Sequence, residues 1–358
     1  MKPQKHLHSS KVDRLSEMPD QVIVHILSFT PTQDAVRTML LRRFGNLWTM
    51  LPLLIFDFND RYVRPGDDGE DDDDGDGDDD NDDDDNAYYA EKQIMSEAFS
   101  RFARFVRNML MFHRSTIDCF QLDIGGYKGV HVDPWLIDDI QVWLKFATER
   151  EVKHLSFTCD YLDDLASPRC VFTSQSLVTL TLCGSMLELD GGLRNLNITT
   201  PSPSRLDLEV YDVPDRPFTL NCPHVISLDI SIRGTSPSIL LDVIDVSSLQ
   251  VVNVRCLPIC LSSLIIKAFL RHFRDVEVFT LSSLAFEELC CVKKVDIPQN
   301  KWRSLALQPW WDNERCLQVI IELVKTSVDL EELVLYSGKS SASEGNHEVL
   351  AQSYRLLV

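Results

Sequence analysis

The sequence predicts an α/β protein in two parts: a short three-helix module, followed by an irregular repeat solenoid with a curved parallel sheet. Apolar residues recur at helical spacing near the N-terminus, which indicates the helical module. A strand-like triplet recurs between about residues 120 and 335, which indicates the solenoid. A run of aspartates stands between the two patterns and separates them.

The strand-like triplets each carry an apolar residue at the first and third positions. They begin at Phe120, Leu155, Leu180, Leu206, Leu228, Val252, Phe279, Leu305 and Leu333. From Leu155 onward their starts lie 22 to 28 residues apart, within the period of leucine-rich repeats. One strand with one return segment cannot bury an apolar face alone, so stacked units must share a continuous core. Leu193, Leu196 and Ile198 offer a competing register, which leaves the repeat boundary beside Leu206 open.

The middle residue of each triplet is predicted to face the concave side of the solenoid. The candidate partner-binding residues on this face are Ser156, Thr181, Asp207, Asp229, Asn253 and Thr280, continued by Ala306 and Val334. They are mostly small and polar, with two acids. A solvated sheet face explains any one of them, but a long concave surface is also how solenoids bind partners.

Residues 15–48 predict three short helices whose apolar faces have little polar cover. Pro19 suits the first turn of a helix. Pro31 ends that helix, because the residue before a proline is pushed out of the α region. Thr32 is a candidate N-cap for the second helix. A unit of about 35 residues rarely folds unaided, so the rest of the chain or another protein must cover its apolar surface.

This front stretch resembles an F-box, the adaptor-binding motif of ubiquitin-ligase substrate receptors, in its plant form. The resemblance rests on residues 13–16 (DRLS), 19–20 (PD), 25–29 (HILSF), 31–32 (PT), 34–36 (DAV), 47–48 (LW) and 51–52 (LP). Met18, Leu41, Phe44 and Gly45 depart from the pattern. Residues 315–337 resemble, in diverged form, the FBD element found near the C-terminus of many plant F-box proteins with leucine-rich repeats.

The resemblance implies a substrate-recognition subunit of a Skp–cullin–F-box type E3 ubiquitin ligase. The F-box would dock on a Skp-type adaptor and through it a cullin–RING complex, while the repeats bind an unidentified target protein. Carried over by position, the implied adaptor contacts are Leu15, Pro19, Ile23, Ile26, Leu27, Pro31, Leu40 and Trp48. The alternative is a non-ligase interaction scaffold that uses the same repeats.

These patterns divide the chain into four parts. We expect a disordered N-terminus (1–12), the F-box (13–60), an acidic disordered linker (61–89) and a leucine-rich-repeat domain (90–358), with a capping helix at 90–113 and the FBD-like element at 315–337. In the capping helix Arg101, Arg104 and Arg107 lie on the polar side. One hypothesis is that these arginines attract the acidic segment. Another is that they form an edge that faces a lipid membrane.

The acidic segment supplies most of the net charge of -20. Between Asp67 and Asp85 it carries fourteen Asp and one Glu, with no Lys or Arg. Such a run repels itself and buries nothing, so it is predicted to be a solvated spacer. Asp72, Asp74, Asp76, Gly77 and Asp83 match part of an EF-hand loop, which makes a calcium-buffering protein a third hypothesis.

Composition and motifs argue against several classes of function. The chain has no Lys/Arg cluster suited to nucleic acid or an anionic membrane, so neither is an expected partner. It shows no secretory start or membrane-spanning run, and its 10 cysteines are scattered; we expect free thiols in the cytoplasm, the nucleus or both. No catalytic or cofactor motif occurs, and we assign no metal-binding residues, so we predict a non-enzyme without a cofactor.

Overall fold

The structure is a computed structural model that describes most of the chain. The described residues are 17–38, 46–58, 84–124, 134–159, 169–184, 195–198, 202–211, 218–233, 241–256, 263–291, 297–308, 314–337 and 352–357. The EF-hand-like residues 72–83 and the N-terminus 1–12 lie outside these ranges, as do Leu15 and Leu40. Among the described helices none is long and apolar enough to cross a membrane.

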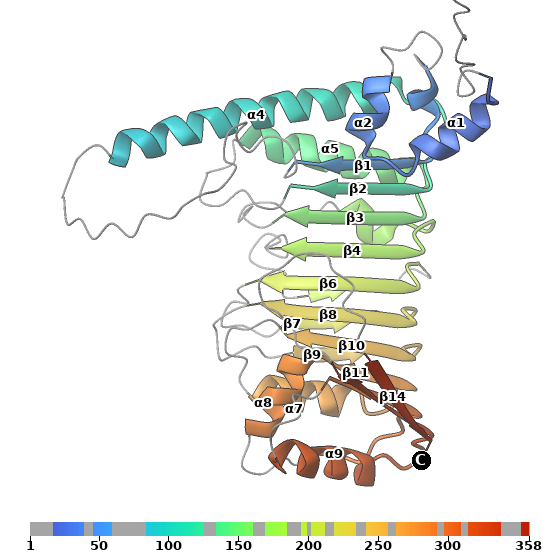
Figure 1. Ribbon diagram of the computed structural model, residues 1–358, viewed down its shortest axis with the longest axis vertical. Helices are drawn as coiled ribbons and strands as arrows, with labels where there is room; N and C mark the ends of the chain where they lie inside the picture. The colour runs from blue at the N-terminus through green and yellow to red at the C-terminus, as the bar shows by residue number, and fades with distance from the viewer. Residues whose placement is uncertain are drawn as a thin grey trace, which may run out of the picture.

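An 11-stranded sheet runs the length of the molecule (Figure 1). Its strands are β1 (Leu53–Asp57), β2 (Cys119–Asp123), β3 (His154–Cys159), β4 (Thr179–Gly184), β6 (Arg205–Tyr211), β8 (Ser227–Arg233), β10 (Val251–Cys256), β11 (Val278–Leu281), β12 (Ser304–Leu307), β13 (Glu332–Ser337) and β14 (Gln352–Leu357). Neighbouring strands follow one another along the sheet and are parallel, except that β14 is antiparallel to β13. This mixed α/β architecture with a mainly parallel sheet fits the predicted repeat fold.

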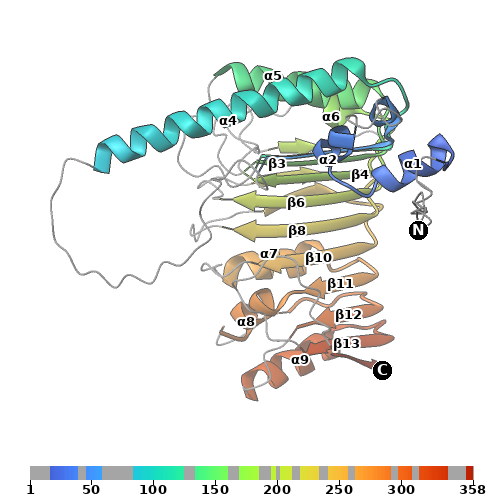
Figure 2. The ribbon, with the colours of Figure 1, turned by 45° about the horizontal axis from the view of Figure 1, so that its top comes forward.

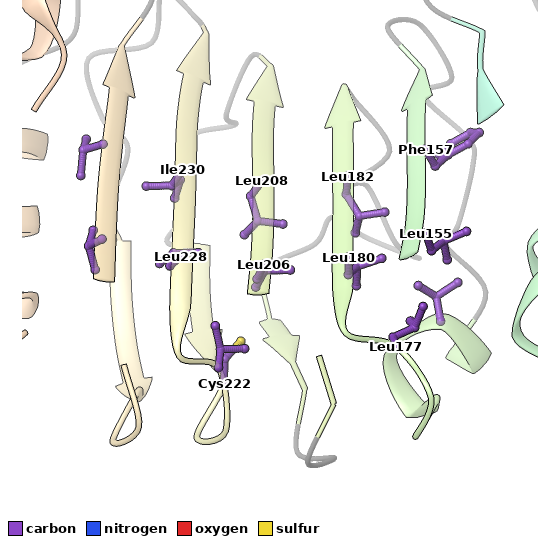
Figure 3. Packing of buried hydrophobic residues seen from close by; sticks show 14 of the residues in the cluster. Leu155, Phe157, Leu177, Leu180, Leu182, Leu206, Leu208, Cys222, Leu228 and Ile230 are labelled. Atoms are coloured by element: carbon purple, nitrogen blue, oxygen red, sulfur yellow. The ribbon is translucent and has the colours of Figure 1, made fainter. Parts of the chain in front are cut away.

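The strand register aligns the predicted triplets with one another. Leu155 pairs with Leu180, Leu180 with Leu206, and Leu206 with Leu228. All four leucines are buried, and so are the third residues of their triplets. Figure 3 shows the two resulting rows of apolar side chains crossing neighbouring strands. Because side chains alternate along a strand, the middle residue of each triplet lies on the opposite, outer face.

A second, 3-stranded parallel sheet replaces helices in the central repeats. It contains β5 (Asn195–Asn197), β7 (Phe218–Asn221) and β9 (Leu241–Asp245), each of which precedes a strand of the large sheet. The competing register beside Leu206 is therefore resolved, because β5 and β6 are both strands and belong to different sheets. Ile198 and Leu220 are buried beside this second sheet and contribute to the core.

Helices are the return segments of the outer repeats. They are α5 (Pro134–Glu149), α6 (Arg169–Thr173), α7 (Ser263–His272), α8 (Ser283–Cys291) and α9 (Glu314–Thr326). The apolar residues Ile140, Trp143, Leu144 and Ala147 of α5 are buried. In residues 315–337, the helix α9 is followed by the strand β13.

The long helix α4 (Asp84–Phe112) begins earlier than residue 90, where the capping helix was expected to start. The C-terminal half of α4 packs against α5, and Phe102 meets Trp143 edge-to-face with ring centroids 6.4 Å apart. The acidic linker expected at 61–89 is thus shorter at its C-terminal end.

Strand β1 corrects the expected boundary between the front module and the solenoid. Residues 53–57 were assigned to the module, but they form the first strand of the large sheet, with Leu54 opposite Phe120 and Phe56 opposite Leu122. The alternating burial of β1 is that of the repeats, which explains the pairing. The acidic segment is consequently an insertion after the first strand of the solenoid.

The front module contains α1 (Asp20–Leu27), α2 (Thr32–Arg37) and the 3-10 turn η2 (Leu47–Met50). Its third helix was expected to reach back to Phe44, but residues 39–45 lie outside the described ranges. Pro19 and Pro31 stand at the N-cap positions of α1 and α2. Thr32 was expected to cap α2; it is instead the first helical residue, and its side chain bonds to the sheet.

Candidate functional site

Helix α1 carries apolar side chains on two faces. Ile23 and Leu27 point into the core. Val22 and Ile26 of α1, together with Phe29 just after its end, remain 42%, 45% and 75% exposed; Val22 and Ile26 are four residues apart and share one face of the helix. We call these three residues the α1 stripe. Exposed side chains of this size in so short a helix are typical of a surface that binds a partner.

The implied adaptor contacts do not all lie on this surface. Pro19, Ile26 and Pro31 are exposed, and Trp48 is half-buried against the core. Ile23 and Leu27 are buried, which corrects the expectation that they are available to a partner: they lie four residues apart on the inner face of α1, and α1 packs against η2. Leu15 and Leu40 lie outside the described residues.

Sequence reasoning missed Val22, Phe29 and Met50 as exposed apolar residues. The spacing of Val22, Ile26 and Phe29 is a helical stripe and could have been read from the sequence. A second stripe of Ile23 and Leu27 runs beside it, however. Periodicity alone does not say which of two adjacent apolar stripes faces the core.

Helix α2 covers the free edge of the large sheet. The side-chain oxygen of Thr32, which is fully buried, accepts a hydrogen bond of 2.7 Å from the backbone N–H of Ile55 in β1. Gln33 Nε2 donates to the backbone oxygen of Asp57 at 3.1 Å. An edge strand otherwise presents unpaired backbone groups. These bonds join the front module to the solenoid at a fixed position.

The start of β1 is also tied to the end of α4. His113 Nε2 lies 2.8 Å from the backbone oxygen of Leu51, and the Arg114 N–H donates to the Thr49 oxygen at 2.9 Å. Burial lowers the pKa of His113 below 6.5, and nearby Arg150 lowers it further, against hydrogen bonds to backbone that raise it. The ring is therefore neutral at pH 7, and Nε2 donates its proton to the carbonyl.

The outer face of the large sheet brings the predicted partner-binding residues into one row. Register pairs join Ser156 to Thr181, Thr181 to Asp207, Asp207 to Asp229, Asp229 to Asn253, and Asn253 to Thr280. Ala306 and Val334 continue the row in register, but both are buried. The accessible part of the row thus ends near Thr280.

The two acids of this row are engaged in contacts within the protein. Asp229 accepts hydrogen bonds from Arg255 Nε at 2.8 Å and Asn253 Nδ2 at 2.9 Å. Asp207 accepts from Arg205 Nε at 3.0 Å and from the Thr181 hydroxyl at 3.3 Å.

The arginines, not the acids, are the groups turned toward solvent. Only 12% of the Asp229 side chain and 19% of the Asp207 side chain are exposed, against 54% and 55% for Arg255 and Arg205. The carboxylates position these guanidinium groups. The outer face therefore presents hydroxyls and arginines, and the two acids that the sequence placed on this face are largely enclosed.

The described residues hold no group of three or more His, Cys, Asp or Glu side chains placed to share a metal ion. None of the cysteines whose side chains are described forms a disulfide.

Comparisons with known proteins connect these surfaces to a family. The F-box/FBD/LRR-repeat protein At5g56420 of Arabidopsis thaliana is 27% identical over 179 residues, 49% of this chain and 33% of that protein. The F-box/FBD/LRR-repeat protein At2g04230 of the same plant is 23% identical over 375 residues, 94% of this chain and 78% of that protein. A third, the putative F-box/FBD/LRR-repeat protein At4g00315, is 48% identical over 56 residues, 15% of this chain and 13% of that protein.

The matched region spans about a third of the first of these relatives. No model of a known protein family matches the chain, and no solved structure does. The mainly parallel repeat sheet and the curated relatives together support the class of plant F-box/leucine-rich-repeat proteins. These relatives support the resemblance of the chain to plant F-box proteins with leucine-rich repeats.

Proposed function

We propose that this protein is a substrate-recognition subunit of a Skp–cullin–F-box type ubiquitin ligase. The front module would dock on a Skp-type adaptor, and the outer face of the large sheet would hold a target protein. A ubiquitin-loaded enzyme carried by the cullin–RING complex would then act on a lysine of the target. The receptor contributes by raising the local concentration of target at that enzyme. Its place of action would be the cytoplasm, the nucleus or both.

The α1 stripe is the observation that carries this proposal. It leaves Val22, Ile26 and Phe29 exposed, whereas Ile23 and Leu27 of the same segment are buried. Exposure of three large apolar side chains to water in one short segment is unfavourable, and a partner that covers them gains their transfer free energy. The names of the curated relatives supply the kind of partner, since they mark F-box proteins.

The bonds between α2, η2 and the sheet give the proposal a geometric consequence. Thr32 and His113 tie the front module to β1 and α4 through hydrogen bonds of 2.7 and 2.8 Å. Adaptor and target would therefore be held at a fixed separation. A receptor built this way presents only those target lysines that its rigid geometry brings within reach of the enzyme.

Binding of the full-length protein to a purified Arabidopsis Skp-type adaptor tests the proposal. Ile26→Asp combined with Phe29→Asp changes only exposed positions, so the fold should persist while affinity falls about 100-fold. Leu317→Asp on α9 is the matched control, because Leu317 is also exposed and lies at the opposite end of the sheet. Absence of adaptor binding by the natural sequence, or equal binding by the double variant and the control, contradicts the proposal.

The non-ligase scaffold makes a different prediction in the same system. If the protein is a ligase subunit, a purified cullin–RING complex should join the adaptor-bound receptor in gel filtration. A scaffold that uses the adaptor alone would exclude the cullin. Co-elution of all components supports the ligase, and a receptor–adaptor complex that never takes up cullin supports the scaffold.

A further inference from the structure

A second group of exposed apolar side chains lies outside the α1 stripe. Met50 in η2 is 48% exposed, and Met111 and Phe112 at the end of α4 are 68% and 52% exposed. We call these three residues the junction patch. They come from two elements that the acidic segment separates in the sequence.

Backbone hydrogen bonds hold the two parts of the junction patch together. The Arg114 N–H donates to the Thr49 oxygen at 2.9 Å, which joins the residue before Met50 to the second residue after Phe112. The buried bond between His113 and the Leu51 oxygen fixes the same junction from the other side. His113 takes the inward position at the end of α4, and Met111 and Phe112 are left on its outer side.

The junction patch and the α1 stripe lie at the same end of the sheet. Both Figure 1 and Figure 2 place the C-terminal end of α4 at the end that carries α1 and α2. The turn η2 packs against α1 and contains Met50, so it connects the two groups. One partner could therefore contact both groups without reaching around the solenoid.

The small size of α1 favours a single partner that contacts both the α1 stripe and the junction patch. An eight-residue helix is about 12 Å long, whereas specific protein interfaces engage roughly 20–30 residues on each side. The α1 stripe alone is too small for a stable complex. The nearest described apolar surface that can enlarge it is the junction patch, whose methionines adapt readily to a partner and whose aromatic ring can anchor it.

We infer that the Skp-type adaptor covers the junction patch together with the α1 stripe, so that its docking surface extends past the F-box onto the end of α4. This inference rests on the proposed function. It makes α4, which is the capping helix of the solenoid, a direct contact of the adaptor. The adaptor then holds the target-binding solenoid as well as the front module, which strengthens the fixed geometry described above.

Affinity measurements on the full-length protein test the inference. Met111→Ser combined with Phe112→Ser should weaken binding to the Arabidopsis Skp-type adaptor by about tenfold or more, because two exposed side chains lose their apolar contact. Val142→Ser on α5 is the matched control and should bind as the natural sequence does, since Val142 is exposed but outside the patch. Hydrogen exchange adds a readout without mutation: adaptor should protect backbone amides at 109–114 in the natural sequence.

The outcomes separate this inference from the proposed function. If the natural sequence does not bind adaptor, both fail. If it binds, but the double variant matches the control and residues 109–114 gain no protection, the inference alone is wrong and the α1 stripe stands. The other possible occupant of the junction patch is a second copy of this chain, which light scattering on the protein without adaptor would detect as a dimer. If the double variant dissociates that dimer and leaves adaptor affinity unchanged, the patch is a dimer interface and the inference is wrong.

Discussion

Thr32 shows how one side chain can join two parts of a protein. Its oxygen is the acceptor for the Ile55 N–H of the edge strand, at a site where the threonine is fully buried. A helix N-terminus favours threonine as a cap, which is how the sequence was interpreted. Tertiary contact overrode that local preference, because the unpaired N–H of an edge strand costs more than an uncapped helix end.

Replacing Thr32 by valine keeps the shape of the side chain and removes the acceptor. We expect Thr32→Val to lower the free energy of unfolding by about 1–3 kcal/mol, the cost of leaving a buried donor unpaired. Urea denaturation measures it. Thr38→Val is the control, since the Thr38 hydroxyl only donates within its own helix to Ala35 at 2.6 Å and is half-buried. A loss no larger than that of the control would contradict the role given to Thr32.

His113 makes the junction between α4 and β1 sensitive to pH. Its pKa is lowered in the folded protein, chiefly by burial, so the unfolded chain binds the proton more readily. Stability from this group is therefore complete above the unfolded pKa of about 6.5 and is lost as the pH falls from there through the lower pKa of the folded protein. Unfolding measured at pH 7.5 and 5.5 should show this loss, and His113→Gln should reduce it. An equal pH dependence in the variant would exclude His113 as its source.

At the scale of single elements, an ion pair on the outer face joins Asp229 of β8 to Arg255 of β10. The Asp229 side chain is enclosed, and the Arg255 side chain is exposed to solvent. Removing the more exposed partner should therefore do the greater harm. Arg255→Ala leaves the Asp229 carboxylate enclosed with the hydrogen bond from Asn253, whereas Asp229→Ala leaves a guanidinium that water can solvate.

We expect Arg255→Ala to destabilise the protein by about 1–3 kcal/mol and Asp229→Ala by less than about 1 kcal/mol. Thermal or urea unfolding of the two single variants and the double variant gives the comparison. The double variant should be close to Asp229→Ala, since the enclosed charge is gone in both. The opposite order of the two single variants would show that the carboxylate is not the enclosed member of the pair.

At the scale of the whole molecule, the front module is held against the sheet of the solenoid, whose first strand β1 follows the module directly in the chain. Leu54 and Phe56 of β1 are fully buried against the repeats, so a fragment that ends after β1 loses their cover. We expect residues 1–60 alone to be unfolded by circular dichroism and NMR. Dispersed amide signals from that fragment would mean that the module folds without the solenoid. Binding tests on the module consequently need the full-length chain.

We expect the acidic segment to contribute nothing to the thermal stability of the folded part of the chain. Exchanging its aspartates between residues 67 and 83 for serine, at constant length, should leave the melting temperature within about 2 °C. Calorimetry in low salt measures it. A substantial rise or fall would show that the segment acts on the folded part, for instance through Arg101, Arg104 or Arg107.

The sequence by itself determined the repeat architecture and the place of most strands. The apolar triplets predicted β2, β3, β4 and their successors because alternation and a period of 22 to 28 residues can be read locally. It also determined the family of the front stretch and the two short helices α1 and α2. Both depend on residue identity and spacing, which need no knowledge of distant contacts.

Only the tertiary structure decided which apolar stripe of α1 is exposed, where the solenoid begins, and how the outer acids are used. Ile23 and Leu27 could not be separated from Val22 and Ile26 by pattern, since both stripes have the spacing of a helix. β1 became part of the solenoid through its pairing with β2, across a long insertion. Asp229 was enclosed by Arg255 from a neighbouring strand. Each outcome depends on residues far apart in the chain, whose proximity is set by the packing of the whole sheet.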